Sequence, residues 1–230
     1  MAAQHQGVEA VERALSILKA FDEGCTEMRL ADLSKKTGLY KSTILRLFVS
    51  LEAFGFLWRD EDGVFRLGPE LWRLGTLYRH VFDLGRFIRP VLRDLVEATQ
   101  ETASFYILEG DHRLCLYREN SPRPVRYHLE EGIRLPLEKG ASGRILLAFG
   151  TAEDPDGAEV RRRGYYVSLG ERDADVAAAA VPLIDNSGRL RGALAVSGLM
   201  NRFDEVARKL AVDLLKKKAA ELAAVLPIVD

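Results

Sequence analysis

The segment 37–57 reads TGLYKSTILRLFVSLEAFGFL and has the periodicity of an amphipathic helix. Four apolar residues recur at positions i, i+3, i+4 and i+7 and form one stripe: Ile44, Leu47, Phe48 and Leu51. At about 100° per residue, Ser42 and Arg46 lie opposite this stripe. The pattern predicts a helix over about 40–54 that is buried on one side and exposes a small, polar, singly basic surface on the other.

Two shorter helices are predicted before this segment. Apolar side chains recur at helical spacing over residues 8–21, and we expect them to form the buried face of the first helix: Val8, Val11, Leu15 and Leu18. Residues 30–36 predict a second helix of about two turns. Gly38 should end it, because glycine readily adopts the left-handed backbone of a helix C-terminus.

A hairpin is predicted after the third helix. The extended runs FLWR and VFRL flank the turn Asp-Glu-Asp-Gly at 60–63. Three helices followed by a hairpin make a winged helix-turn-helix, which we expect to span residues 1–68. In such a domain the helix after the tight glycine turn lies in the major groove of DNA, with its N-terminal residues nearest the bases.

The rest of the chain predicts a linker helix and a second domain. Residues 69–84 form a helix whose apolar stripe needs a partner surface, in its own chain or in a second copy: Leu71, Leu74, Tyr78 and Val81. Over 85–230, helices are predicted at 86–100, with Pro90 in the first turn, in GASGRILLAFG, and from 204 to about 225. Strands are predicted in TASFYIL, RLCLYRE, VRYHL, GYYVSL, VAAAAVPLI and RLRGALAVSGL. This domain should be α+β with a mostly antiparallel sheet.

The composition is that of a folded protein, with 230 residues, 47% apolar and 29% charged. The formal net charge of −1 argues against a chain that coats DNA non-specifically, so any DNA contact must come from a local surface. The isolated Cys25 and Cys115 support neither a disulfide framework nor a metal knuckle. The chain has no apolar run near the roughly 20 residues of a membrane span and no signal-peptide pattern. We therefore expect a cytoplasmic protein with no membrane partner, metal or cofactor.

Candidate DNA contacts gather at the beginning of the third helix. Ser42 and Thr43 suit either an N-terminal cap or phosphate contacts, and the two roles are compatible. Arg46 is the sharper candidate, because an arginine opposite the buried stripe can donate two hydrogen bonds to a guanine. Its plain alternative is a solvated arginine. Lys41 suits a phosphate, and Tyr40 suits a sugar or a base.

The hairpin carries two further candidates. Arg59 and Arg66 are predicted to face each other across the strands and to straddle the phosphate backbone. The alternative is that they pair with Asp60, Glu61 or Asp62, and an acidic wing tip would repel DNA. Both interpretations stay open at this point.

Six sequence blocks in this order resemble the IclR family of bacterial transcriptional regulators: ERALSILKAF, TGLYKSTILRLFVSLEAFGFL, FRLGPELWRLG, LPLEKGASGRILLAF, RRRGYYVS and VSGLMNRF. The resemblance covers nearly the whole chain, from about residue 8 to 226. It implies a winged helix-turn-helix that binds a double-stranded DNA operator, a dimerising linker helix, and a GAF/profilin-like C-terminal domain that binds a small effector, often an organic or aromatic acid. It also implies a homodimer or a dimer of dimers.

The resemblance carries the family's effector positions onto seven residues of this chain: Leu135, Ala141, Ser142, Ser168, Val176, Ala178 and Ser197. Tyr106 and Tyr117, and likewise Arg126 and His128, are weaker candidates, since aromatic residues in strands more often pack in the core. In some members the position of Ala195 carries a hydroxyl group and that of Ser168 an acid, so a small polar acid should be held less well here. A more apolar or larger ligand is then possible.

The chain departs from the family pattern at three places. The family usually has proline where Tyr40 stands. It has a Ser or Thr cap where Arg29 stands, so the second helix should lack a side-chain cap, at a cost of about 1 kcal/mol. The segment between 149 and 164 is shorter than usual, so a helix and loop beside the effector pocket should be trimmed.

The sequence favours a regulator over an enzyme. Ser142 in KGASGR does not lie in a GxSxG nucleophile elbow, and no histidine is placed to act as a general base for it. No GxxxxGK phosphate loop is present either. Backbone amides at the start of this helix suit an effector carboxylate instead. Two alternatives stay open: a C-terminal domain that only oligomerises and, less favoured, an enzyme that uses the winged helix to dimerise.

Overall fold

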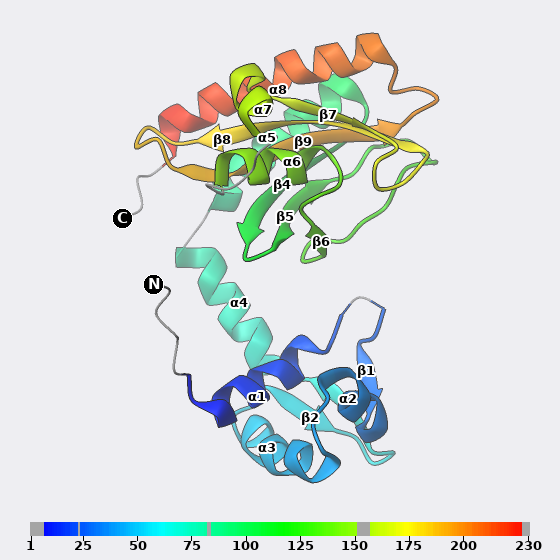
Figure 1. Ribbon diagram of the computed structural model, residues 1–230, viewed down its shortest axis with the longest axis vertical. Helices are drawn as coiled ribbons and strands as arrows, with labels where there is room; N and C mark the ends of the chain where they lie inside the picture. Colours follow the sequence, from blue (N-terminus) through cyan, green and yellow to red (C-terminus); the bar gives the residue numbers. More distant parts are fainter. Residues whose placement is uncertain (1–6, 23, 82–83, 151–156, 227–230) are drawn as a thin grey trace. The chain divides into compact units, whose positions relative to one another are not determined.

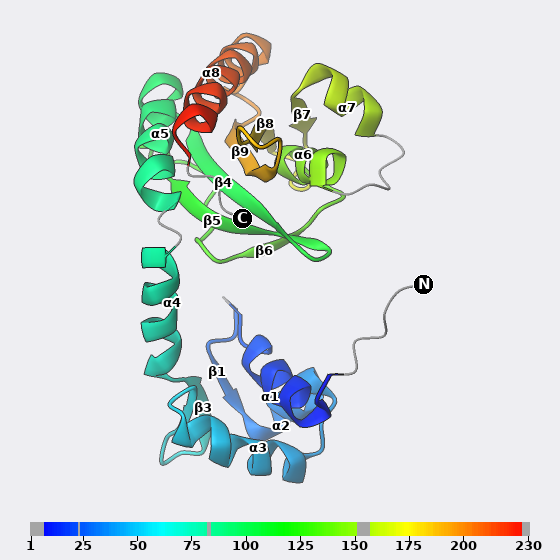
Figure 2. The same ribbon diagram turned by 90° about the vertical axis from the view of Figure 1, so that its left-hand side faces the viewer.

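The computed structural model describes residues 7–22, 24–81, 84–150 and 157–226. The chain divides into two compact units, Met1–Phe82 and Asp83–Asp230, and each is described by itself (Figures 1 and 2). The first holds a helix-turn-helix with a small sheet, and the second holds helices on a larger antiparallel sheet. The predicted fold class is therefore confirmed.

The first unit consists of helices around a small sheet. Its elements are α1 (Glu9–Lys19), β1 (Glu27–Arg29), α2 (Leu30–Thr37), α3 (Lys41–Ala53), β2 (Leu57–Arg59), β3 (Val64–Leu67) and α4 (Pro69–Val81). The strands pair antiparallel in the order β1-β3-β2. β2 and β3 are the predicted hairpin. The sequence did not predict β1, because its three residues are too few to show an alternation.

The predicted apolar stripe of α3 packs in the core of this unit. Ile44, Phe48 and Leu51 are buried. The rings of Phe48 and Phe65, on β3, meet edge to face with their centroids 5.0 Å apart. Since this stripe fixes one side of α3 to its own domain, the opposite side is left for another partner.

α2 begins and ends by different means. Arg29 provides no side-chain cap, as expected, but its backbone N–H donates to the Asp32 carboxylate at 3.1 Å. This bond is half of a capping box and satisfies one N–H group at the helix start. Gly38 ends the helix with a φ of 72°, as predicted, and allows the tight turn into α3.

The predicted buried face of α1 is wrong at three of its four residues, while Leu18 is half-buried and packs against the core. Val8, Val11 and Leu15 are exposed, and the helix buries Ile17 instead. Two apolar stripes run along this sequence, and the stripe that includes Ile17 packs on α3. The spacing of apolar residues alone does not show which of the two stripes is buried. Val11 and Leu15 line an apolar groove of about 310 Å³ between α1 and α3, together with Phe54.

α4 lies in the segment predicted to be a linker helix. Proline at its first position is favourable, because that N–H has no partner within a helix. Along its described part, Leu71 is half-buried, while Trp72 and Leu74 are exposed. The side chains of Tyr78 and Val81, which complete the predicted stripe, lie outside the described residues.

The second unit is one antiparallel sheet with helices on both faces. Its elements are α5 (Leu84–Thr99), β4 (Thr102–Glu109), β5 (His112–Glu119), β6 (Arg134–Pro136), α6 (Ala141–Gly150), α7 (Gly157–Arg163), β7 (Tyr166–Leu169), β8 (Val176–Ile184), β9 (Leu190–Leu199) and α8 (Glu205–Val225). The strand order is β6-β5-β4-β9-β8-β7. Every described pairing in it is antiparallel.

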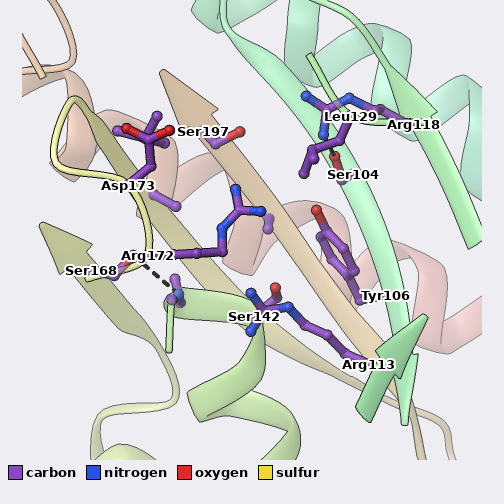
Figure 3. A pocket seen from close by; sticks show the side chains of 15 residues that line it. Ser104, Tyr106, Arg113, Arg118, Leu129, Ser142, Ser168, Arg172, Asp173 and Ser197 are labelled. Carbon is purple, nitrogen blue, oxygen red and sulfur yellow. Dashed lines mark hydrogen bonds between the residues drawn. The ribbon is translucent and has the colours of Figure 1, made fainter. Parts of the chain in front are cut away.

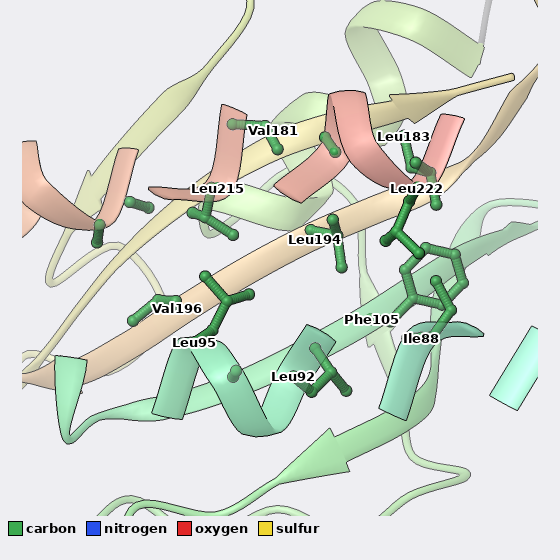
Figure 4. Close-up of a cluster of buried hydrophobic side chains, with 14 of the residues drawn as sticks. Ile88, Leu92, Leu95, Phe105, Val181, Leu183, Leu194, Val196, Leu215 and Leu222 are labelled. Atoms are coloured by element: carbon green, nitrogen blue, oxygen red, sulfur yellow. The ribbon is translucent and has the colours of Figure 1, made fainter. Parts of the chain in front are cut away.

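Two hydrophobic cores lie on opposite faces of this sheet. α5 and α8 cover one face, where their buried residues meet those of the strands (Figure 4). α6 and α7 cover the other. Ala177 and Ala179 of β8 face the first core and Ala180 faces the second, so the alanine run lets helices pack closely on both sides.

Two local predictions in this unit are wrong, and one helix was not predicted. The segment VRYHL (125–129) is not a strand, and β6 pairs with β5 in its place. Pro90 lies in the interior of α5, because the helix begins at Leu84 and not at Arg86. α7 was not predicted.

Candidate functional site

The outer face of α3 carries the predicted DNA contacts. Tyr40, Lys41, Ser42 and Arg46 are exposed, and Thr43 is half-buried. Tyr40 is the N-cap residue and no side chain caps the helix, so the prediction of a capping role for Ser42 or Thr43 is wrong. Both lie in the first turn, where backbone N–H groups without helical partners and hydroxyl groups suit a phosphate.

The two arginines of the wing do not face each other, contrary to the prediction. Arg66 lies opposite Trp58, and Arg59 lies opposite Phe65. The Arg59 guanidinium covers the Phe65 ring at 5.1 Å from its centroid. The hairpin register is therefore shifted by one residue from the expected one, which sends the two arginines to different places.

Arg66 is paired with acids. Its guanidinium contacts Glu27 of β1, and also Asp60 at 3.4 Å. These contacts, led by Glu27, raise the pKa of Arg66, while the Val64 N–H and then Arg66 lower the pKa of Asp60. The alternative of acid pairing thus holds for Arg66, and Arg59 is the exposed candidate of the wing.

A cavity of about 40 Å³ lies in the second unit, between the start of α6 and the sheet face that α6 covers (Figure 3). Several predicted effector residues line it: Tyr106, Ala141, Ser142, Ser168, Val176, Ala178 and Ser197. Leu135 and Tyr117 do not, because Leu135 is buried in the core under α6 and Tyr117 in the opposite core. Arg126 and His128 are exposed and also lie outside the lining.

Strand register explains this gathering. Ala178 of β8 pairs with Ser197 of β9 on one side and with Ser168 of β7 on the other, so the three form a row across the sheet. Ser104 of β4 pairs with Ala195 of β9. These residues have small side chains, which leave the space above the sheet that becomes the cavity.

The first backbone amides of α6 are partly occupied by protein groups. The Ala141 N–H donates to the Ser168 hydroxyl at 3.1 Å (Figure 3), and the Gly140 N–H donates to the Glu171 carboxylate at 2.9 Å. Ser142, the next helical residue, is buried and lines the cavity. The positive end of the helix dipole therefore points at the same space and favours an anion there.

Sequence reasoning missed three arginines that line the cavity: Arg113, Arg118 and Arg172. The first two, on β5, are buried, and Arg172 is half-buried in the segment after β7. The expectation of a more apolar ligand does not fit this lining. The one signal in the sequence was the segment RLCLYRE, where two arginines lie in a strand whose apolar residues indicate that it is buried.

A β-bulge turns Arg118 into the cavity and Tyr117 away from it. The pairing of β5 with β4 skips Leu116, between Cys115 and Tyr117. In a regular strand, residues 115 and 117 would share one face. One extra residue inverts the alternation beyond it, so Tyr117 packs in the core under α5 and α8, while Arg118 faces the cavity.

Arg113 is held in a desolvated position against the start of α6. It is 2% exposed, its Nη1 donates to the Lys139 carbonyl at 2.6 Å, and its Nε has no hydrogen-bond partner within the described residues. Burial lowers the pKa of Arg113 to about 10, so it stays a cation at neutral pH. Burial likewise raises the pKa of Tyr106, against the opposing effect of the cavity arginines.

Two kinds of site are not found in the part of the chain that the structure describes. No three or more His, Cys, Asp and Glu side chains gather in a way that would hold a metal ion. None of the helices there combines the length and hydropathy that crossing a bilayer requires.

A winged helix with an exposed recognition helix, followed by an α+β unit with a polar cavity, defines the class of DNA-binding transcriptional regulators. Comparison with protein families gives the same result: residues 10–61 match the IclR helix-turn-helix domain, and residues 76–158 and 155–224 match the bacterial transcriptional regulator IclR C-terminal domain. The chain belongs to the IclR family.

Named relatives are similar over most of their length. The regulator XynR of Escherichia coli is 29% identical over 86% of this chain and 89% of its own, and BhcR of Paracoccus denitrificans is 29% identical over 94% and 87%. Both are named as HTH-type transcriptional regulators, which confirms the prediction of a regulator rather than an enzyme.

Solved structures show the same fold. An IclR regulator from Silicibacter sp. TM1040 has a TM-score of 0.83 and 29% identity, covering 94% of this chain and 95% of that one. An IclR homologue from Microbacterium hydrocarbonoxydans, solved in complex with 4-hydroxybenzoate, has a TM-score of 0.79 and 23% identity, covering 94% and 98%.

Proposed function

We propose that this protein binds a specific operator as a homodimer, and that a small organic acid in the cavity of the second unit changes its affinity for DNA. The observation that carries the proposal is the polar cavity at the start of α6. The 4-hydroxybenzoate complex of a structural relative supports an acid as the class of ligand. Such a regulator would act in the cytoplasm.

In this proposal α3 enters the major groove of the operator. Arg46 is exposed opposite the buried stripe and can donate two hydrogen bonds to a guanine. The residues beside it would contact phosphates, sugars or a neighbouring base: Tyr40, Lys41, Ser42 and Thr43. Arg59 would contact the DNA phosphate backbone from the wing. Arg66 would contribute less, because its guanidinium already pairs with Glu27 and Asp60.

Apolar surface on the first unit supports a homodimer. Val11, Leu15 and Phe54 are exposed around the groove between α1 and α3, and Trp72 is exposed on α4. Contiguous exposed apolar surface commonly marks an interface. A two-fold dimer would present two α3 helices to the two half-sites of a palindromic operator. Sedimentation analysis distinguishes this dimer from a dimer of dimers.

The effector would act by a population shift. It binds one arrangement of the dimer better than another, and the two arrangements differ in how well both α3 helices fit the operator. The change in DNA affinity cannot exceed the effector's preference for one arrangement over the other.

The test uses the full-length protein and an operator selected from genomic fragments. Organic and aromatic acids are screened by thermal shift, because a specific ligand raises the melting temperature in proportion to RT ln(1 + [L]/Kd). Each binder is then added to a fluorescence-anisotropy titration of the operator. We expect at least one binder to change DNA affinity. If binders leave DNA affinity unchanged, or if no acid binds, the second unit only oligomerises and the proposal fails.

A further inference from the structure

We infer that the effector is an organic dianion with two carboxylates, held by Arg113, Arg118 and Arg172. This inference rests on the proposed sensor function and makes it more specific, because it names the charge and the chemical class of the ligand. These residues line the cavity, and their guanidinium groups lie apart from one another around Tyr106 (Figure 3).

The charge of the lining calls for such a ligand. Three arginines and one acid, Asp173, line the cavity, a formal balance of two positive charges. Within the described residues, no carboxylate forms an ion pair with the guanidinium of Arg113, Arg118 or Arg172, although the charge of Glu138 acts on Arg113, and Nε of Arg113 lacks any hydrogen-bond partner. A buried cation without a counterion is strongly unfavourable, and two carboxylates on one ligand restore neutrality.

In the described part of the chain, the guanidinium of Arg118, which is also buried, donates only to neutral acceptors, whereas its backbone N–H donates to the Glu131 carboxylate at 2.8 Å. Its Nε donates to Asn120 at 3.1 Å, its Nη1 to the Ser104 hydroxyl at 3.2 Å, and its Nη2 to the Tyr127 carbonyl at 2.8 Å. These bonds fix the guanidinium without cancelling its charge. Arginine has five donor N–H groups in a planar fork, so donors are left for a carboxylate.

The two buried arginines address opposite ends of the cavity. Because of the bulge, Arg113 and Arg118 are four strand positions apart, or roughly 13 Å between their Cα atoms. Arg113 is tied to the Lys139 carbonyl at the start of α6, whereas Arg118 is tied to groups on the far side of Tyr106 (Figure 3). Two separated cations match two separated carboxylates better than a single one.

Arg172 is placed to cover the ligand. It lies between the other two arginines in Figure 3, is half-buried, and packs over the Tyr127 ring at 4.9 Å from the centroid. The cavity of about 40 Å³ is smaller than typical ligand sites of about 300 Å³ and more. A ligand of several heavy atoms therefore requires Arg172 to swing outward, after which its guanidinium can close over a carboxylate.

The test compares dicarboxylates with monocarboxylates of equal chain length. Calorimetry on the full-length protein uses succinate, glutarate and adipate against butyrate, valerate and hexanoate, and phthalate against benzoate. We expect the best dicarboxylate to bind roughly 10- to 100-fold more tightly than its partner, the worth of one charge-assisted hydrogen-bonded contact.

Arg172→Gln is the informative variant, because this side chain is outside the core and its loss should not impair folding. We expect it to reduce the preference for the dicarboxylate by about tenfold or more. The matched control is Arg134→Gln, an exposed arginine of the same sheet that pairs with Glu109 outside the cavity. It should leave the preference unchanged.

The outcomes separate the two ideas. If monocarboxylates bind as tightly as dicarboxylates, if none of these acids binds, or if Arg172→Gln keeps the full preference, the dianion inference is overturned. A monocarboxylate that still changes operator affinity would leave the sensor function standing. A dicarboxylate that binds with the expected preference and leaves operator affinity unchanged would support the site and refute the sensor function.

Discussion

Gly143, in the first turn of α6, shows how closely this helix meets Arg113. A Cβ atom there would lie 2.1 Å from Nη1 of Arg113 and 2.2 Å from the Leu137 carbonyl oxygen. The carbonyl belongs to the backbone and cannot move cheaply. Gly143→Ala should therefore destabilise the protein by about 1–3 kcal/mol in urea unfolding, although alanine is the better helix former. Gly75→Ala in α4, with nothing within 4 Å, is the control and should be neutral or stabilising by about 0.5–1 kcal/mol. Equal effects would contradict this account.

Arg46 is the residue that tests DNA reading. Arg46→Ala should weaken binding to the operator by about 1–3 kcal/mol and binding to random DNA much less, because a base contact adds only to specific binding. Arg93→Ala, at an exposed position of α5, provides a variant with the same loss of charge. Anisotropy titrations at one fixed salt concentration measure both. An equal loss on operator and random DNA would assign Arg46 to the phosphate backbone instead.

Cavity residues could be predicted from the family resemblance, but not where a local irregularity of the strand decides which way a side chain points. Ser142 and Ser168 came from the family resemblance, and both line the cavity. Arg118 could not be found, since its direction depends on the bulge at Leu116. The same bulge explains why Tyr117, expected at the site, packs in the opposite core.

Among the helices, the spacing of apolar residues predicted the buried face correctly where the helix has a single apolar stripe. α3 has one such stripe, and its helix, buried face and exposed face agree with the prediction. α1 has two, and tertiary packing chose the one that includes Ile17. β1 and β6, with three residues each, are too short for any alternation to be seen. They exist because a neighbouring strand offers free hydrogen-bonding groups.

The turn between β8 and β9 should make stability depend on pH. The Ser187 hydroxyl, at 2.5 Å, is the main cause that lowers the pKa of Asp185 from 3.8 to about 2. Because the folded-state pKa is depressed, this contribution is complete above pH 4 and is lost as the pH falls toward about 2. Urea unfolding between pH 5 and 2.5 should show a shallower fall in stability for Asp185→Asn than for the native protein. Asp213→Asn, on the exposed side of α8, should keep the native slope. An unchanged slope in Asp185→Asn would refute this role of the turn.

In the intact regulator, we propose that acid binding and operator binding are linked. Linkage is reciprocal: if the acid changes operator affinity by some factor, the operator must change acid affinity by the same factor. The family resemblance predicted both binding units, but no feature of the sequence gives the size or the sign of this factor. In the proposed dimer, this factor depends on the energy difference between its two arrangements.

The most direct measurement is a pair of titrations on the full-length protein. One measures operator affinity with and without the tightest dicarboxylate, and the other measures affinity for that dicarboxylate with and without saturating operator. We expect both affinities to change by the same factor, roughly 5- to 150-fold. Tight binding of the acid with a factor of one in both titrations would contradict the account.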